Sequence, residues 1–533
     1  MTKTENLPNT LGELKKAGYK VLAVKDEIRK NLVEKLRNKT EIFPGIIGYE
    51  KTVIPQIVNA ILAKHDIIFL GLRGQAKTKM ARMLVDLLDE YTPIIKGSEI
   101  NDNPYFPISK FAVDTVEANG DDTEIEWIGR ERRFGEKLAT PDVTIADLIG
   151  DIDPIKAATQ RLHYSHEGAI HFGIVPRTNR GIFAINELPN LQPRIQVGLL
   201  NIMQERDIQI RGFNIRFPLD VFIVYTANPE DYTNRGNIIT PLKDRIDSQI
   251  ITHYPKSIED GIKITESQSW IKRHHDKDVI IPYYMKEIIE SAAHEARRSE
   301  FVEQKSGVSA RMTISAMENL VSNAERRSII NDEKIIFPRI TDLGAVLPGM
   351  TGKIELVFEG EQEGPVKVSK ALLGKSIREV FRKYFPDPLK RKTKSPASNA
   401  FQKSELSRED ISKTEQGNTA TEPYQDVIGW FEDGNYIELN DDMKFEEYFN
   451  TLKRVEGLEK TVRKHIKTIE NEYELASLME FMLDGLHNNS KIAKDELDDG
   501  VSYKDMVGAM LYNKATQRDS RSSYDYESEE WNS

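Results

Sequence analysis

The sequence predicts an α/β fold in which buried parallel strands alternate with amphipathic helices. Three short apolar runs carry this prediction: 65–72 (HDIIFLGL), 181–188 (GIFAINEL) and 221–228 (VFIVYTAN). Apolar runs this short, separated by helical patterns, are typical of strands that helices cover on both faces. The chain has 533 residues, which is enough for about three or four domains.

Composition and hydrophobic periodicity divide the chain into successive segments. Apolar residues recur at helical spacing in the first 40 residues, and the stretch after residue 256 is mostly helical in pattern. Residues 387–425 are rich in Ser, Thr, Lys and Pro and poor in large apolar residues, as in mobile linkers. We therefore expect an N-terminal helical segment (1–40), an α/β domain (41–255), a helical domain (256–386), a flexible linker (387–425), a C-terminal helical domain (426–515) and a disordered tail (516–533).

The overall composition excludes several classes of protein. The chain has no cysteine, which rules out disulfides, thiolate metal sites and a cysteine nucleophile. No window approaches the roughly 18 consecutive apolar residues of a membrane span, and the first residues do not resemble a signal peptide. We therefore expect a cytoplasmic protein with no membrane partner. With 85 acidic and 74 basic residues, the formal net charge is -11, which does not favour binding to nucleic acid.

The first apolar run is followed by a loop that has the character of a phosphate-binding loop. The sequence from Gly71 to Thr78 is GLRGQAKT, and a helical pattern follows. Gly71 and Gly74 would let backbone N–H groups converge on phosphate oxygens, Lys77 would reach the outer phosphates, and the Thr78 hydroxyl would ligate Mg²⁺. The usual pattern has a second glycine where this chain has Ala76, whose methyl group crowds the backbone if φ is positive there. The alternative is a strand–turn–helix with a chance lysine.

Polar residues also end the second and third apolar runs. Asn186 and Glu187 end the second run and Asn228 ends the third, and ligands of open α/β sheets bind at this edge. Glu187 is the candidate general base that polarises an attacking water. Asn186 could hold a metal through its amide oxygen but brings no charge. Asn228 could orient the water or contact a γ-phosphate. The alternative for the second run is a buried strand with an Asn-Glu turn.

Two arginines further along the chain are weaker candidates. Arg245 follows a Pro-Leu helix start, and Arg311 opens a helical stretch in the next domain. In a ring of identical subunits, Arg245 could enter the neighbouring site and stabilise charge on the transferring phosphoryl group. Arg311 could reach the same phosphates. A run of His163, His166 and His171 lacks a nearby acidic partner pattern, so we do not interpret it as a metal site.

In their order and spacing, these elements resemble the AAA+ ATPases, and within them the I subunit of magnesium chelatase and its MoxR-like relatives. The resemblance covers roughly residues 42–385 and is most specific over 145–250. Two insertions of this clade are recognisable, as hairpins around 161–171 and at 207–217. The matching stretches are IADLIGDIDPIKA (145–157), HEGAIHFGIVPRTNRGIFAINEL (166–188), GLLNIMQERDIQIRGFNIRFPLDVFIVYTANPED (198–231) and ITPLKDRID (239–247).

The resemblance implies a fold and a role for each candidate residue. The fold is a P-loop NTPase αβα sandwich with a parallel sheet, followed by a helical lid domain over 256–386. The implied roles are Gly71, Gly74, Lys77 and Thr78 in the Walker A loop, Asn186 and Glu187 in Walker B, Asn228 as sensor 1, Arg245 as the arginine finger and Arg311 as the sensor-2 arginine.

The function that the resemblance implies is an ATP-hydrolysing motor that uses ATP and Mg²⁺. It would form a homo-oligomeric ring, a hexamer, and would remodel a partner with a von Willebrand factor A domain or drive metal insertion. One alternative is a nucleic-acid or transcription machine on the same fold, although the GAFTGA sequence of enhancer-binding activators is missing. Another is a non-hydrolysing scaffold, because Ala76 and Asn186 depart from the family pattern.

Overall fold

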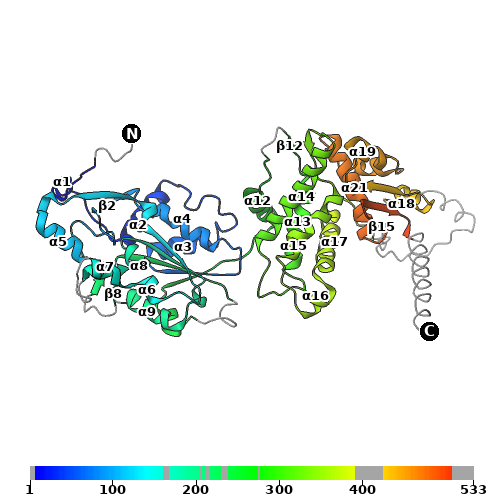
Figure 1. Ribbon diagram of the computed structural model, residues 1–533. Coiled ribbons are helices and arrows are strands. Elements are labelled where there is room, and N and C mark those ends of the chain that lie inside the picture. Colours follow the sequence, from blue (N-terminus) through cyan, green and yellow to red (C-terminus); the bar gives the residue numbers. More distant parts are fainter. Residues whose placement is uncertain are drawn as a thin grey trace, which may run out of the picture. The chain divides into compact units, whose positions relative to one another are not determined.

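The computed structural model describes residues 7–159, 167–204, 207–210, 216–229, 238–273, 277–389 and 424–506. It consists of two compact units, shown in Figure 1. The first comprises Met1–Lys256 with Lys305–Ser309, and the second comprises Ser257–Gln304 with Ala310–Ser533. The change of unit after Lys256 falls next to the end of the expected α/β domain at residue 255.

The first unit is built on a five-stranded sheet in which every neighbouring pair of strands is parallel. The three apolar runs of the sequence form three adjacent central strands, with Ile67 opposite Val224 and Val224 opposite Ala184. This topology confirms the expected P-loop NTPase sandwich with a parallel sheet. The strand order is β11 (Ser248–Ile251), β1 (Ile67–Leu70), β10 (Val221–Ala227), β7 (Gly181–Asn186) and β4 (Phe134–Leu138).

Helices cover both faces of this sheet because successive strand residues point to opposite sides. Ile182 of β7 belongs to one buried cluster together with residues of α2 (Val24–Arg37), α3 (Val53–Leu62) and α4 (Lys77–Met83). Its neighbour Phe183 belongs to the other cluster, together with residues of α8 (Ile174–Arg177), α9 (Pro193–Gln204) and α11 (Thr240–Arg245). The central strands are therefore packed between two apolar cores, one on each face of the sheet.

Helix α2, from the expected N-terminal segment, is part of this sandwich. Its buried Glu27 accepts hydrogen bonds from both terminal nitrogens of Arg133, at 2.7 and 2.6 Å. A bidentate pair of this kind is geometrically specific, and removal of either partner would leave a buried charge unpaired.

Short antiparallel ladders interrupt the sandwich. Strand β2 (Tyr91–Ile95) pairs with β3 (Ile125–Gly129), β5 (Gly150–Ile152) with β6 (Ile170–Phe172), and β8 (Asp207–Gln209) with β9 (Arg216–Pro218). The ladder of β8 and β9 lies at the expected hairpin of 207–217, whose residues 211–215 lie outside the described residues. Of the other expected hairpin, around 161–171, residues 161–166 lie outside the described residues, so it stays a prediction. The remaining elements of this unit are α1 (Leu11–Lys16), η1 (Leu84–Leu87), α5 (Lys110–Asn119), η2 (Gly120–Asp122), η3 (Arg130–Arg133), α6 (Ile145–Leu148), α7 (Pro154–Thr159), η4 (Glu167–Ala169) and η5 (Leu188–Asn190).

The second unit begins with a mostly helical region, as the sequence predicts. Its long helices carry buried apolar faces, and α13 packs against both α14 and α17. The elements are α12 (Ile258–Gln268), β12 (Asp278–Val279), α13 (Tyr283–Ala296), α14 (Ala310–Ile330), β13 (Ile335–Ile336), η6 (Ile340–Val346), α15 (Leu347–Thr351), α16 (Phe358–Glu363) and α17 (Pro365–Tyr384).

The C-terminal region contains the expected helices, but helices are not its only elements. An antiparallel sheet in the order β14–β16–β15 lies beside the helices, and β15 and β16 are joined at Asp498-Asp499, before Gly500. An Asp-Gly pair at a hairpin turn is a sequence signal for such a connection. The elements are α18 (Gln425–Glu432), β14 (Ile437–Asn440), α19 (Phe445–Lys453), α20 (Leu458–His465), α21 (Glu472–Asn488), β15 (Ala493–Leu497) and β16 (Gly500–Lys504).

Nor does this region form a unit of its own. The buried Glu480 of α21 accepts hydrogen bonds from the backbone N–H groups of Ile340 and Thr341, at 2.9 and 3.1 Å. The ring of Phe481 stacks on Tyr284 of α13, with 4.2 Å between the ring centroids. Residues 424–506 are therefore packed into the same compact unit as the helical region. Most of the expected linker (390–423) and all of the expected tail lie outside the described residues. Within the described segments, none of the helices combines the length and apolar character that a bilayer span requires.

Candidate functional site

The loop after β1 wraps around the side chain of Lys77, the first residue of α4. Lys77 is only 7% exposed. Its Nζ donates to the carbonyl oxygens of Gly71 at 2.5 Å and Leu72 at 2.9 Å, and to Oδ1 of Asn228 at 2.6 Å. The lysine therefore links the loop to the end of β10, where the sequence predicts the sensor residue.

Residues that follow β11 hold the loop in shape. The Thr252 hydroxyl donates to Oε1 of Gln75 at 2.6 Å, and the Tyr254 hydroxyl donates to the Arg73 carbonyl at 2.9 Å. The Tyr49 hydroxyl donates to the Gln75 carbonyl at 3.2 Å, and burial raises the pKa of Tyr49 to about 12. No sequence signal predicts the contacts of Thr252 and Tyr254, because they join segments about 180 residues apart.

The two predicted loop glycines have no room for side chains. A Cβ on Gly71 would lie 2.0 Å from Oγ1 of Thr252, and one on Gly74 would lie 2.0 Å from Oγ of Ser309. Gly74 also has φ of +72°, in the left-handed region that favours glycine. The close packing and the backbone conformation together explain why glycine stands at both positions.

Ala76 adopts the left-handed conformation that the sequence pattern implied for its position. Its φ and ψ are 57° and 14°, immediately before the first residue of α4. For a residue with a Cβ this conformation costs about 1–2 kcal/mol. The loop therefore keeps the shape that a glycine would give it, at a cost in free energy.

We expect Ala76→Gly to stabilise the first unit by about 1 kcal/mol, because the substitution removes the left-handed penalty. Chemical denaturation of the full chain measures the change. The matched control is Ala118→Gly, at an exposed position of α5, where glycine should instead destabilise by about 1 kcal/mol. If both substitutions destabilised the protein equally, the strain at Ala76 would be refuted.

Glu187 lies at a sharp turn directly after β7. Its φ of 57° and ψ of 46° are left-handed, and its backbone N–H donates to the Thr226 hydroxyl at 3.1 Å. The carboxylate Oε2 accepts from Nδ2 of Asn228 at 2.8 Å. Strain of this kind in a residue that is not glycine persists only where the surrounding contacts enforce it, as is common at functional sites. Lys77, Asn228 and Glu187 thus form one chain of contacts.

Asn186, the last residue of β7, presents its amide oxygen to two hydroxyl groups. Thr78 donates to Oδ1 at 3.2 Å, and Thr226 donates to it at the same distance. The amide nitrogen donates to Oε1 of Glu136 at 2.6 Å. These three partners fix the orientation of the amide, because its nitrogen is held by a carboxylate and its oxygen faces Thr78.

Glu136, on the neighbouring strand β4, is a site residue that sequence reasoning missed. Its carboxylate also receives two hydrogen bonds from Arg82 of α4, at 2.7 and 2.9 Å. It stands two residues before the position of β4 that pairs with Asn186. Only the strand pairing reveals this acid, because β4 reads as a mixed polar segment and was not predicted as part of the sheet.

The oxygen atoms gathered here suit a hard divalent cation. Hydroxyl, amide and carboxylate oxygens are the ligands that Mg²⁺ prefers, and in nucleotide sites it binds one or two protein groups together with phosphates. Among the described residues, no group of three or more His, Cys, Asp and Glu side chains is arranged to hold a metal by itself. Thr78 and Asn186 therefore fit a magnesium ion that phosphate oxygens also bind.

The two predicted arginines lie on other elements. Arg245 is the last residue of α11, and its Nη1 donates to the carbonyl oxygen of Pro241 at 2.9 Å. Arg311 belongs to the second unit, where it is exposed in the first turn of α14. The structure thus brings together Lys77, Thr78, Asn186, Glu187 and Asn228, while the arginine roles remain predictions.

A phosphate loop after β1, an acidic residue after β7 and a polar residue after β10, in a parallel sheet of this order, are consistent with the AAA+ nucleotide-binding module that the sequence resembles. Sequence comparison finds curated relatives that include subunits of magnesium chelatase.

The similarity to these relatives is partial. The chain is 24% identical over 262 residues to the chloroplastic magnesium-chelatase subunit ChlI of Nicotiana tabacum, covering 46% of this chain and 55% of that protein. It is 26% identical over 243 residues to the magnesium-chelatase 38 kDa subunit of Cereibacter sphaeroides, covering 44% and 65%. The chain thus spans about half the length of the first of these and less than two thirds of the second. No family model matches.

A comparison with solved structures includes a cryo-EM-based structure of the complex between subunits BchI and BchD of magnesium chelatase. It shows 16% identity and covers 60% of this chain and 98% of that chain, with a TM-score of 0.32.

Proposed function

We propose that the protein is an ATP-hydrolysing AAA+ motor of the magnesium chelatase I type. The observation that carries this proposal is the chain of contacts from Lys77 through Asn228 to Glu187. It joins the loop that would hold the phosphates to the carboxylate that would activate water. A strand–turn–helix with a chance lysine has no reason to bury that lysine against these partners.

In this proposal each residue has a defined task. Backbone N–H groups of the loop and Lys77 hold the phosphate oxygens, and Glu187 accepts a proton from the water that attacks the γ-phosphate. Asn228 holds the Glu187 carboxylate in place. Thr78 and Asn186 would hold Mg²⁺, which neutralises charge on the phosphates when it is bound.

The neutral Asn186 does not argue for a non-hydrolysing scaffold. The Glu136 carboxylate, which also pairs with Arg82, lies 2.6 Å from its amide nitrogen, so an acidic side chain stands near the position where the family carries an acid. The candidate base Glu187 and the loop lysine are both in place. We therefore favour a working ATPase over a scaffold.

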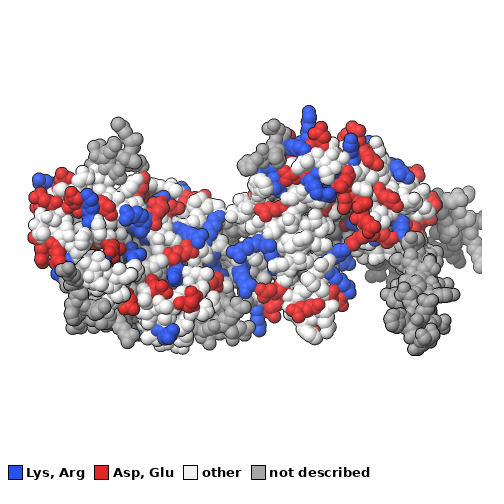
Figure 2. Space-filling model, viewed as in Figure 1, with Lys and Arg blue, Asp and Glu red and all other residues white. Residues whose placement is uncertain are grey.

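Assembly and partner are inferred from the relatives. Curated relatives include subunits of magnesium chelatase, and in line with the resemblance to that family we propose a homo-oligomeric ring, a hexamer, in which Arg245 reaches the site of the adjacent subunit. The partner would be a protein with a von Willebrand factor A domain, and the work done on it remodelling or metal insertion. A nucleic-acid machine is less favoured because the chain is net acidic, with a formal charge of -11, and acidic side chains are abundant on the face that Figure 2 shows.

Mg²⁺-dependent ATP hydrolysis by the purified protein tests the proposal. We expect turnover in the wild type and loss of both nucleotide binding and turnover in Lys77→Ala, because the loop loses the cation that faces the phosphates. Fluorescent-nucleotide binding and phosphate release measure the two effects separately. A wild type that binds ATP but turns it over no faster than Lys77→Ala, with and without added Mg²⁺, would favour the scaffold.

A further inference from the structure

A cavity lies in the first unit, at the edge of the sheet where β7 and β10 begin. Its volume is about 530 Å³, within the range of small-molecule sites. Apolar side chains form much of its wall, and Phe106 beside it is 71% exposed. The candidate ATP site is at the opposite ends of the same strands, so this cavity is separate from it. Apolar lining residues include Val21, Leu22, Ile108 and Leu219.

Most charged groups around the cavity already form ion pairs. Each pair joins one cation and one carboxylate within 2.9 Å, so these residues need no ligand to balance their charges. The pairs are Lys25 with Asp66, Lys64 with Asp26, and Arg133 with Glu27.

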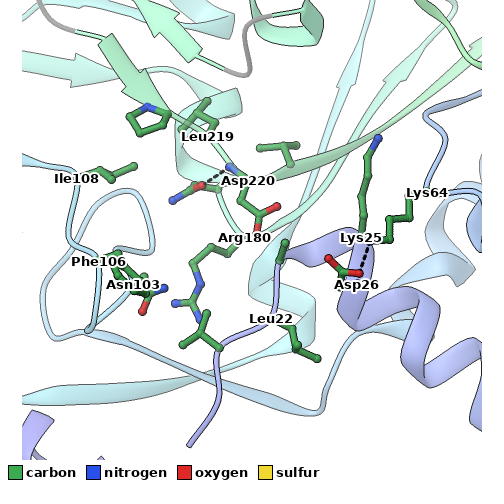
Figure 3. A pocket seen from close by; sticks show the side chains of 15 residues that line it. Leu22, Lys25, Asp26, Lys64, Asn103, Phe106, Ile108, Arg180, Leu219 and Asp220 are labelled. Atoms are coloured by element: carbon green, nitrogen blue, oxygen red, sulfur yellow. Dashed lines mark hydrogen bonds and ion pairs between the residues drawn. The ribbon is translucent and has the colours of Figure 1, made fainter. Parts of the chain in front are cut away.

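Arg180 is the exception among the cations. It is 6% exposed, and its guanidinium makes one hydrogen bond in the described part of the chain, from Nη1 to the Pro93 carbonyl at 2.7 Å. No carboxylate of the described residues forms an ion pair with it. Burial, together with the like charge of Arg133, lowers the pKa of Arg180 to about 10, so it remains charged at neutral pH. Figure 3 shows its side chain extending toward Asn103 and Phe106.

Asp220 is the matching exception among the carboxylates. Its Oδ2 accepts the backbone N–H of Val24 at 2.8 Å, and no cation of the described residues lies within ion-pair distance of it, although Arg180 and Arg133 attract it from further away. Burial raises the pKa of Asp220. Arg180 and Asp220 both line the cavity and precede the first residues of β7 and β10, so the two strands fix their positions. Arg180 is also strained, with φ of +58°.

We propose that this cavity binds a small zwitterion, an α-amino acid with an apolar side chain. Its carboxylate would pair with Arg180, its ammonium group with Asp220, and its side chain would lie against Leu22, Leu219 and Phe106. Buried charges are costly unless they are paired. A single zwitterion would give the Arg180 guanidinium and the Asp220 carboxylate each a partner of opposite charge. A simple anion or a simple amine would satisfy one of the two and leave the other unpaired.

Isothermal titration calorimetry on the full chain tests the proposal with three matched probes: L-phenylalanine, 3-phenylpropanoate and 2-phenylethylamine. The first carries both charges, and each of the others carries one of them on a similar skeleton. We expect L-phenylalanine to bind, and each analogue to bind about tenfold more weakly or worse, because a charged hydrogen-bonded partner is lost.

Variants locate the site. Arg180→Met and Asp220→Asn should each weaken L-phenylalanine binding about tenfold, while an unchanged circular dichroism spectrum reports an intact fold. Phe106→Ala, at an exposed position that the fold does not need, should weaken it as well. The proposal is overturned if millimolar L-phenylalanine does not bind, if the analogues bind equally well, or if none of the variants changes its affinity. ATP hydrolysis does not enter the test, so the proposed motor function stands or fails separately.

Discussion

Glu187→Gln is expected to lower ATP turnover about 10²–10⁴-fold, the range that a positioned general base contributes. The amide has nearly the same shape as the carboxylate but cannot accept a proton from water at neutral pH. ATP binding should persist, because the loop and Lys77 are unchanged. Single-turnover phosphate release, together with nucleotide binding, distinguishes a lost chemical step from lost affinity.

The control for this variant is Glu456→Gln, at an exposed position of the second unit. It makes the same chemical change and should leave turnover unaltered. A Glu187→Gln enzyme as fast as Glu456→Gln would show that another group activates the water. Glu136 would then be the first candidate, since its carboxylate also lies beside Asn186.

Arg245→Ala should lower turnover by about 10³–10⁵-fold, the contribution of an arginine finger to phosphoryl transfer. This expected loss of turnover depends on the proposed ring, in which the Arg245 side chain reaches the nucleotide of the neighbouring subunit. ATP binding to isolated subunits should change little, because the loop contacts are made within each subunit. Steady-state turnover at a protein concentration that saturates assembly is the measurement.

Lys243→Ala, on the exposed side of the same short helix, is the matched control, and it should keep most of the activity. Sedimentation of both variants shows whether the ring still forms. An equal loss of turnover in the two variants would indicate damage to α11. Unchanged turnover in Arg245→Ala would show that Arg245 is not an arginine finger.

The central strands and their polar ends could be predicted from sequence because each signal is local. A short apolar run and the polar residue that ends it are adjacent in the chain, so Asn186, Glu187 and Asn228 were found together with their strands. The consequence of Ala76 was also predictable, since the glycine pattern specifies a left-handed residue at that position.

The supports of the site could not be predicted in the same way. Glu136 acts through the pairing of β4 with β7, and Thr252 and Tyr254 reach the loop only after the sheet has formed. Contacts between distant segments leave no periodic pattern in the sequence from which they could be predicted. In the C-terminal region, three short strands were not predicted, because the sequence pattern there is mainly helical. The Asp499-Gly500 pair at the hairpin is a local signal for two of them.

ATP turnover in mixtures of Arg245→Ala and Glu187→Gln shows whether neighbouring subunits share a catalytic site. In a ring with shared sites, an Arg245→Ala subunit keeps Glu187, and a Glu187→Gln neighbour supplies Arg245, so some sites in mixed rings are intact. In an equal, random mixture, about one quarter of the sites should be restored, by the geometry of a head-to-tail ring. If sites are shared, two inactive proteins that are mixed and allowed to reassemble should regain about one quarter of the wild-type turnover. Turnover that stays at the sum of the separate variants, in rings shown to exchange subunits, would contradict the shared site.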